Sequence, residues 1–194
     1  MWFLSEESGW SHLYTATPGG RAKALTRGEW EASEPQWSRD GNTVYFLCNR
    51  ARPGDYEVCA VSREGGDVRE VTALDGVEDF ALSADGSRLL LRWSSHHTPA
   101  QLAVQPVAGG EAVKLTDTRS EDYKARRWLA PQMVRVPSTH GAGSVWAKLY
   151  RPETLEPGRK YPVVMFVHGA GYLQNVHARF PVYFREQMFH QLLV

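Results

Sequence analysis

Short apolar stretches separated by turn residues run through the first two thirds of the chain. The patterns at 43–47, 56–62, 88–93 and 101–107 predict strands, because they are rich in apolar and β-branched residues and are flanked by Gly, Asp and Ser. Their alternation of apolar and polar positions is imperfect, as expected for sheets that are covered on both faces. The pattern therefore predicts an all-β region.

Three marks recur at one spacing along this region. Paired glycines are each followed by an apolar residue and a threonine, as in Gly19-Gly20 with Leu25-Thr26, Gly65-Gly66 with Val71-Thr72, and Gly109-Gly110 with Leu115-Thr116. Ser-x-Asp-Gly turns occur at 38–41 and 83–86, so that Asp40 and Asp85 are 45 positions apart. A period of roughly 40–50 residues is typical of β-propellers, which have four strands in each blade. An ordinary antiparallel sandwich is the alternative.

The repeat accounts for about two and a half blades, whereas a closed propeller has at least four. The pattern predicts a strand from Met1 onward, and the chain stops at Val194 inside an apolar pattern that has no stop signal. We therefore expect a fragment of a longer protein whose true N-terminus is missing. Localisation in the cytoplasm or the periplasm stays open for that reason.

The pattern changes after Thr116, where the 45-residue period ends. We expect a partial all-β propeller at 1–118, a linker at 119–131, and the first strands of an α/β-hydrolase domain at 132–194. The charged stretch 119–127 is interpreted as a solvated connector.

The last part of the chain predicts one hairpin and one buried strand. Stretches 133–136 and 145–150 flank a Gly-rich turn, as in a β-hairpin. The continuous apolar run 163–167 favours a central strand of a parallel sheet, covered on both faces.

The residues after this run carry the most specific chemical signal in the chain. His168, Gly169, Ala170, Gly171 and Tyr172 follow it directly. A strand followed by His-Gly-small-Gly is typical of the oxyanion loop of α/β-hydrolases. Such a loop needs backbone N–H donors close to the developing charge, and small residues allow that approach. We therefore expect Gly169 and Ala170 to be the donors and the other three to support the loop; a plain strand-to-helix turn is the alternative.

The nucleophile elbow Gly-x-Ser-x-Gly does not occur in the sequence. Gly9-Trp10-Ser11 resembles its first half, but Leu13 stands in place of the second glycine. The Ser, Asp and His of a catalytic triad would then lie beyond Val194. We expect the isolated chain to be inactive.

Composition and charge exclude several other classes of function. Lys plus Arg and Asp plus Glu are both 22, and this balance argues against nucleic-acid binding. Every apolar run is far shorter than the roughly 20 residues of a membrane span. His96-His97 has no partners at metal-ligand spacing and is interpreted as a strand-end pair. Cys48 and Cys59 could face each other across adjacent strands, but we interpret them as free, buried cysteines. We expect neither a metal nor a cofactor.

Three segments resemble a known enzyme family. Residues 3–14 and 25–31 resemble late blades of dipeptidyl peptidase IV-like enzymes, and 161–177 resembles the start of the catalytic domain in bacterial members of the prolyl oligopeptidase family. The resemblance implies a serine peptidase with an eight-bladed propeller and an α/β-hydrolase domain. It implies a peptide substrate, from which dipeptides with proline or alanine in second position are released. A homo-oligomer of the full-length protein stays open.

The sequence departs from this family at two points. His168 stands where dipeptidyl peptidase IV has a tyrosine that helps to form the oxyanion hole. The paired glutamates that bind the substrate amine would lie upstream of Met1, and Glu6-Glu7 is interpreted as a solvated turn. An endopeptidase or an acylaminoacyl-type relative therefore remains open. A non-catalytic propeller scaffold that binds peptides or proteins is the alternative from another class.

Overall fold

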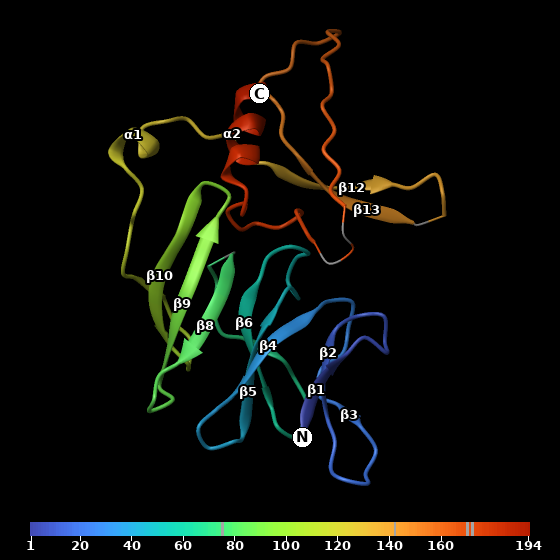
Figure 1. Ribbon diagram of the computed structural model, residues 1–194, viewed down its shortest axis with the longest axis vertical. Coiled ribbons are helices and arrows are strands. Elements are labelled where there is room, and N and C mark those ends of the chain that lie inside the picture. Colours follow the sequence, from blue (N-terminus) through green and yellow to red (C-terminus); the bar gives the residue numbers. More distant parts are fainter. Residues whose placement is uncertain (75, 142, 170, 172) are drawn as a thin grey trace.

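Three antiparallel sheets stand side by side in the computed structural model, and the C-terminal third of the chain lies across one end of them (Figure 1). The structure describes residues 1–74, 76–141, 143–169, 171 and 173–194. Neither helix among these residues is long and apolar enough to cross a membrane.

Each sheet is a meander in which every strand pairs with the next along the chain. The first sheet has β1 (Trp2–Ser5), β2 (His12–Thr15) and β3 (Lys23–Ala24). The second has β4 (Ala32–Trp37), β5 (Thr43–Cys48), β6 (Glu57–Ser62) and β7 (Arg69–Glu70), and the third has β8 (Val77–Leu82), β9 (Arg88–Ser95), β10 (Thr98–Pro106) and β11 (Val113–Lys114). The glycine pairs lie in the hairpin connections β2–β3, β6–β7 and β10–β11, one in each sheet. The sheets form no closed ring within the part of the chain that the structure describes.

The Ser-x-Asp-Gly turns join the first two strands of each four-stranded sheet. Ser38 Oγ donates to Asp40 Oδ1 at 2.6 Å and accepts from the Thr43 N–H at 2.9 Å, so one hydroxyl ties the turn to the next strand. The second turn repeats this arrangement. Hydrogen bonds to its carboxylate lower the pKa of Asp85 to about 2, and the bond from the Ser83 hydroxyl has the largest effect.

The repeated threonine closes the outer edge of each sheet. Its hydroxyl oxygen accepts a hydrogen bond from a backbone N–H of the neighbouring strand, just beyond the two-residue outer strand. The three pairs are Leu13 N with Thr26 at 3.0 Å, Val58 N with Thr72 at 2.8 Å, and Leu102 N with Thr116 at 2.9 Å. The side chain of the residue before each donor also forms a hydrogen bond with the threonine hydroxyl; these residues are His12, Glu57 and Gln101. The sequence repeat is therefore a repeated hydrogen-bonding unit.

The second sheet is covered on both faces, because an apolar cluster lies on each side of it. Val44, Phe46 and Cys48 of β5 pack with Leu13 and other residues of the first sheet. Tyr45 and Leu47 pack in a separate cluster with residues of the third sheet. Successive residues of a strand point to opposite faces, so β5 is buried along most of its length. This packing explains why its sequence does not alternate.

The cysteine prediction is wrong, because Cys48 and Cys59 form a disulfide. Cys59 pairs with Phe46 and Cys48 pairs with Glu57 in the β5–β6 register, which places the two cysteines diagonally on one face. Their Cα atoms are 5.9 Å apart, within the range that a disulfide spans. The long β5–β6 connection does not fix the strand register, so the sequence allowed the two cysteines to face each other but did not decide whether they are bonded.

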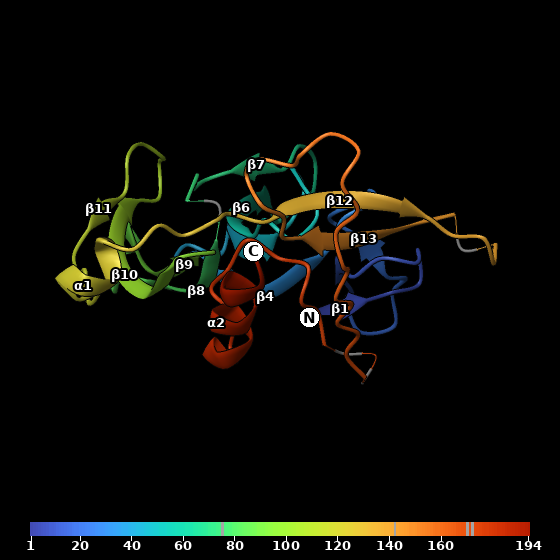
Figure 2. The same ribbon diagram turned by 90° about the horizontal axis from the view of Figure 1, so that it is seen from above.

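The C-terminal third contains a hairpin and two helices. Strands β12 (Gln132–Pro137) and β13 (Ser144–Leu149) confirm the predicted hairpin. The expected solvated connector contains the short helix α1 (Glu121–Lys124), which has no buried residue and whose first turn is capped by the Ser120 hydroxyl. The chain ends with α2 (Phe184–Leu193), which lies against the third sheet in both views (Figures 1 and 2).

The apolar run 163–167 does not form the buried strand that its sequence predicts. The segment is irregular, and the exposed fraction of its side chains ranges from 50% at Phe166 to 85% at Val163. A parallel strand needs hydrogen-bonded neighbours and covering helices. None of the described strands pairs with this segment.

Candidate functional site

The loop around His168 is exposed where the structure describes it. His168 Nδ1 lies 2.8 Å from the carbonyl oxygen of Gly169. A Cβ atom added to Gly169 or Gly171 would meet nothing within 4 Å, so the loop is open on that side. Ala170 and Tyr172 lie outside the described residues. The oxyanion role of Gly169 and Ala170 stays a prediction, as does the supporting role of the other three residues.

Residues 173–180, here called the strap, follow this loop and are bound to the second sheet. Tyr56 OH donates to Gln174 Oε1 at 2.7 Å, and the Ala178 N–H donates to the Gly54 carbonyl at 3.0 Å. Gly54 and Tyr56 belong to the connection between β5 and β6. The strap thus contacts the end of the second sheet that faces the C-terminal third (Figure 1).

The strap is also bound to the third sheet. The Phe180 N–H donates to Ser94 Oγ at 2.9 Å, and Ser94 Oγ donates to Glu78 Oε1 at 2.5 Å. The guanidinium of Arg179 lies 4.2 Å from the centre of the Tyr56 ring, in a cation–π contact. The strap therefore joins two neighbouring sheets to the His168 loop.

Two glycines allow the backbone contacts at this place. Gly54 has φ of +84°, and a Cβ there would lie 2.5 Å from the Val176 carbonyl oxygen and 2.9 Å from the His177 Cα. A Cβ on Gly76 would collide with the Ser94 carbonyl oxygen. Glycine is required at both positions because the colliding atoms belong to backbone.

Histidine and lysine side chains gather beside the strap. Burial, and then the charge of Lys148, lower the pKa of His96 to about 3 and that of His177 to about 4. Burial lowers the pKa of Lys148 to about 8. Both imidazoles are therefore neutral at pH 7, and protonation would place several positive charges together in a poorly solvated region.

Two glutamines one turn apart hold α2 to the rest of the chain. Gln187 is fully buried; its Nε2 donates to the His96 carbonyl at 3.1 Å, and its Oε1 accepts from Tyr150 OH at 3.1 Å. Gln191 accepts from the Leu129 N–H at 2.9 Å and donates to the Leu129 carbonyl at 2.8 Å. The helix is thus tied to the β9–β10 turn and to the linker.

Sequence reasoning placed some of these residues correctly and missed others. His96-His97 lies at the β9–β10 turn, which confirms its interpretation as a strand-end pair, and Glu6-Glu7 is an exposed turn as expected. Tyr56, Arg179 and Gln187 were missed, because their partners lie far away in the sequence. Gly54 and Gly76 lie outside the repeat, and such glycines were the one feature of the sequence that could have indicated a close approach of backbone segments at this place.

The chain also has a surface hollow and a group of possible metal ligands. A hollow of about 320 Å³ lies along the linker and is lined by Trp128, Leu129, Ala130, Gln132, Arg151, Pro152 and Glu153. Among the described residues, the group whose ligand atoms are close enough to share a metal ion is Cys48, Cys59 and Glu70.

Comparison with known proteins identifies the family. The sequence model of the dipeptidyl peptidase IV (DPP IV) N-terminal region matches residues 1–100, which include the first two sheets and most of the third. The chain belongs to this family. The blade repeat and the sheet meanders of this DPP IV-like chain agree with that assignment.

Similar proteins extend the match beyond residue 100. The DPP IV-like chain is 25% identical over 185 residues to the probable dipeptidyl-aminopeptidase B of Coccidioides posadasii (strain C735). This match covers 91% of this chain and 20% of that protein. It is 26% identical over 175 residues to human dipeptidyl peptidase 8, covering 81% of this chain and 19% of that protein. The chain thus spans about a fifth of the length of these relatives.

A solved structure shares the fold. The crystal structure of Porphyromonas gingivalis dipeptidyl peptidase 4 superimposes with a TM-score of 0.77 at 23% sequence identity. The match covers 96% of this chain and 27% of that one. The arrangement of sheets in the DPP IV-like chain therefore occurs within a larger solved protein.

Proposed function

We propose that this chain is part of a serine peptidase of the dipeptidyl peptidase type, which cleaves peptides by acyl transfer. The observation that carries the proposal is the His-Gly-Ala-Gly loop, followed directly by a strap that is bound to two propeller blades. The names of the similar proteins support the same reaction class.

In this proposal residues 1–118 are blades of an eight-bladed propeller and residues 119–131 are a linker. Residues 132–194 begin the α/β-hydrolase domain, and the run 163–167 becomes a buried strand when the rest of that domain covers it. The large exposed side chains of this run support the proposal, because apolar surface of this extent is a favourable target for burial.

The proposed role of this chain in the reaction is stabilisation of negative charge. The serine of a triad elsewhere in the full-length protein attacks the substrate carbonyl, and a histidine takes the serine proton. The carbonyl oxygen then becomes an oxyanion, to which the N–H groups of Gly169 and Ala170 donate. The strap fixes the loop in advance, so these donors need no reorganisation as charge develops.

Steady-state kinetics of the full-length protein with an Ala-Pro chromogenic substrate test the proposal. We expect Ala170→Val to lower kcat by about 100-fold or more with little change in KM, because loss of one oxyanion donor costs about 3–4 kcal/mol. Ala108→Val is the matched control, since Ala108 lies in the exposed turn before β11, and both constants should stay unchanged.

The possible outcomes separate the two parts of the proposal. A full-length protein that cleaves no Ala-Pro or Gly-Pro substrate would overturn the dipeptidyl peptidase assignment and favour a scaffold. An active protein in which Ala170→Val keeps the wild-type kcat would overturn only the role of the loop.

A further inference from the structure

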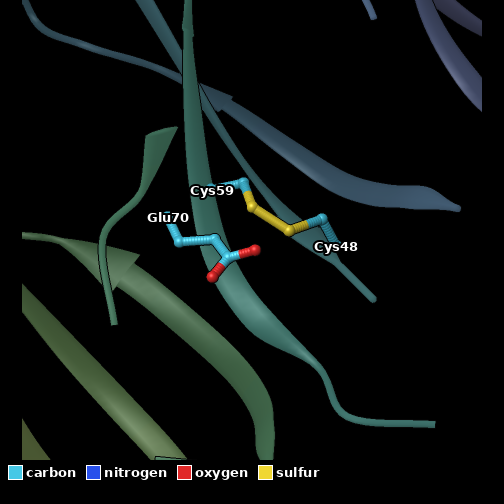
Figure 3. A group of neighbouring side chains, drawn as sticks. All are labelled: Cys48, Cys59 and Glu70. Atoms are coloured by element: carbon cyan, nitrogen blue, oxygen red, sulfur yellow. A yellow bond between two sulfur atoms is a disulfide. The ribbon is translucent and has the colours of Figure 1, made fainter. Parts of the chain in front are cut away.

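Two cysteines and a carboxylate form a row across three neighbouring strands of the second sheet (Figure 3). Cys48 lies on β5, Cys59 on β6 and Glu70 on β7, and Cys59 is directly opposite Glu70. Directly opposed residues share a face of the sheet, so the three side chains point to the same side. Their two Sγ atoms and a carboxylate oxygen lie within 4.8 Å of one another.

We propose that reduction of the Cys48–Cys59 disulfide converts this row into a zinc site, with two thiolates and the Glu70 carboxylate as ligands. Thiolate sulfur selects zinc among the common divalent ions, and carboxylate oxygen is an accepted third ligand. A tetrahedral site with bonds of about 2.3 Å to sulfur and about 2.1 Å to oxygen separates its ligand atoms by about 3.5–4 Å. After reduction the two sulfur atoms, which are bonded to each other in the oxidised protein, have to move apart to this distance, and water on the exposed side of Glu70 completes the site.

The surroundings favour a metal-bound form over free thiolates. Cys48 and Cys59 are 1% and 0% exposed and lie in the apolar cluster that includes Trp30 and Phe46. Two free thiolates in such surroundings would carry two uncompensated negative charges, whereas zinc with two thiolates and the Glu70 carboxylate leaves a single negative charge, on the side where Glu70 is exposed. Glu70 is exposed on the outer strand β7, so the metal has a path from solvent along this edge.

The redox step balances with a dithiol reductant. The Cys48–Cys59 disulfide accepts two electrons and two protons, and the reductant becomes a disulfide. Zinc binding then displaces the two thiol protons. Both forms link the ends of the β5–β6 connection, which carries Gly54 and Tyr56 to the strap.

Cobalt titration of the reduced full-length protein tests this site. The protein is reduced without oxygen by an immobilised dithiol, freed thiols are counted, and Co²⁺ is added as the spectroscopic probe. We expect thiolate-to-cobalt charge-transfer bands and tetrahedral d–d bands that are absent before reduction and disappear when Zn²⁺ is added. The Cys48→Ser protein supplies the baseline for any other metal site in the full-length protein.

Matched variants on one hairpin test the carboxylate. Glu70→Gln keeps both cysteines, and we expect it to weaken cobalt binding at least tenfold while far-ultraviolet circular dichroism of the oxidised protein stays unchanged. Glu64→Gln changes an exposed glutamate beyond β6 and should bind cobalt like the wild type. A disulfide that resists reduction in the folded protein, a cobalt spectrum that survives in Cys48→Ser, or wild-type affinity in Glu70→Gln would each overturn the proposed site.

Discussion

Replacing Gly54 with alanine tests whether the strap depends on its backbone contact with the β5–β6 connection. The new Cβ would lie 2.5 Å from the Val176 carbonyl oxygen and 2.9 Å from the His177 Cα. Carbon atoms do not approach backbone atoms this closely in folded proteins, so the strap has to move away. The movement breaks the hydrogen bond from the Ala178 N–H to the Gly54 carbonyl.

The expected magnitude follows from the bonds that depend on this approach. The Gly54–Ala178 bond and the neighbouring Tyr56–Gln174 bond each contribute about 1 kcal/mol to docking of the strap. Their loss lowers the free energy of strap opening by about 2 kcal/mol, which corresponds to about a thirtyfold increase in the open population. Alanine at a positive φ adds about 1–2 kcal/mol of backbone strain, which any comparable glycine would also show.

Gly41→Ala is the matched control for that strain. Gly41 has φ of +70°, and a Cβ there would meet nothing within 4 Å. Hydrogen exchange of the full-length protein, read on peptides that cover the strap, measures opening directly. We expect protection of the Ala178 amide to fall about thirtyfold in Gly54→Ala and to stay unchanged in Gly41→Ala. Equal protection in the two variants would refute the reasoning.

Three further results are expected. Thr72→Val removes the hydroxyl that the Val58 N–H and the buried Glu57 carboxyl share, so the free energy of protection against hydrogen exchange at the Val58 amide should fall by about 1–3 kcal/mol. An unchanged exchange rate would contradict the role of the threonine. Burial lowers the pKa of His177, which belongs to the strap, to about 4, so the released strap binds more protons and docking should weaken as pH falls from about 6.5 toward 4. Limited proteolysis at pH 7 and pH 5 measures this change, and His177→Gln should reduce it; equal cleavage at both pH values would exclude it. The isolated 194-residue chain should not cleave an Ala-Pro substrate, and cleavage blocked by a serine-directed inhibitor would contradict this.

The sequence alone determined the blade repeat. In each Ser-x-Asp-Gly turn the side chains bond to backbone and to each other within five residues, and each repeated threonine bonds to a residue 13 or 14 positions earlier in the chain. These contacts are local, and they recur because every blade needs the same turn and the same closure of its outer strand. Patterns of this kind are visible without knowledge of the neighbouring blades.

Only the tertiary structure decided the contacts between distant segments. The Tyr56–Gln174 and Phe180–Ser94 bonds join residues 118 and 86 positions apart, and nothing in either local pattern indicates its partner. The Cys48–Cys59 disulfide depends on a strand register that the β5–β6 connection leaves undetermined. The apolar run 163–167 shows the same dependence in reverse: its sequence favours a buried strand, yet a strand is buried only where other strands and helices cover it.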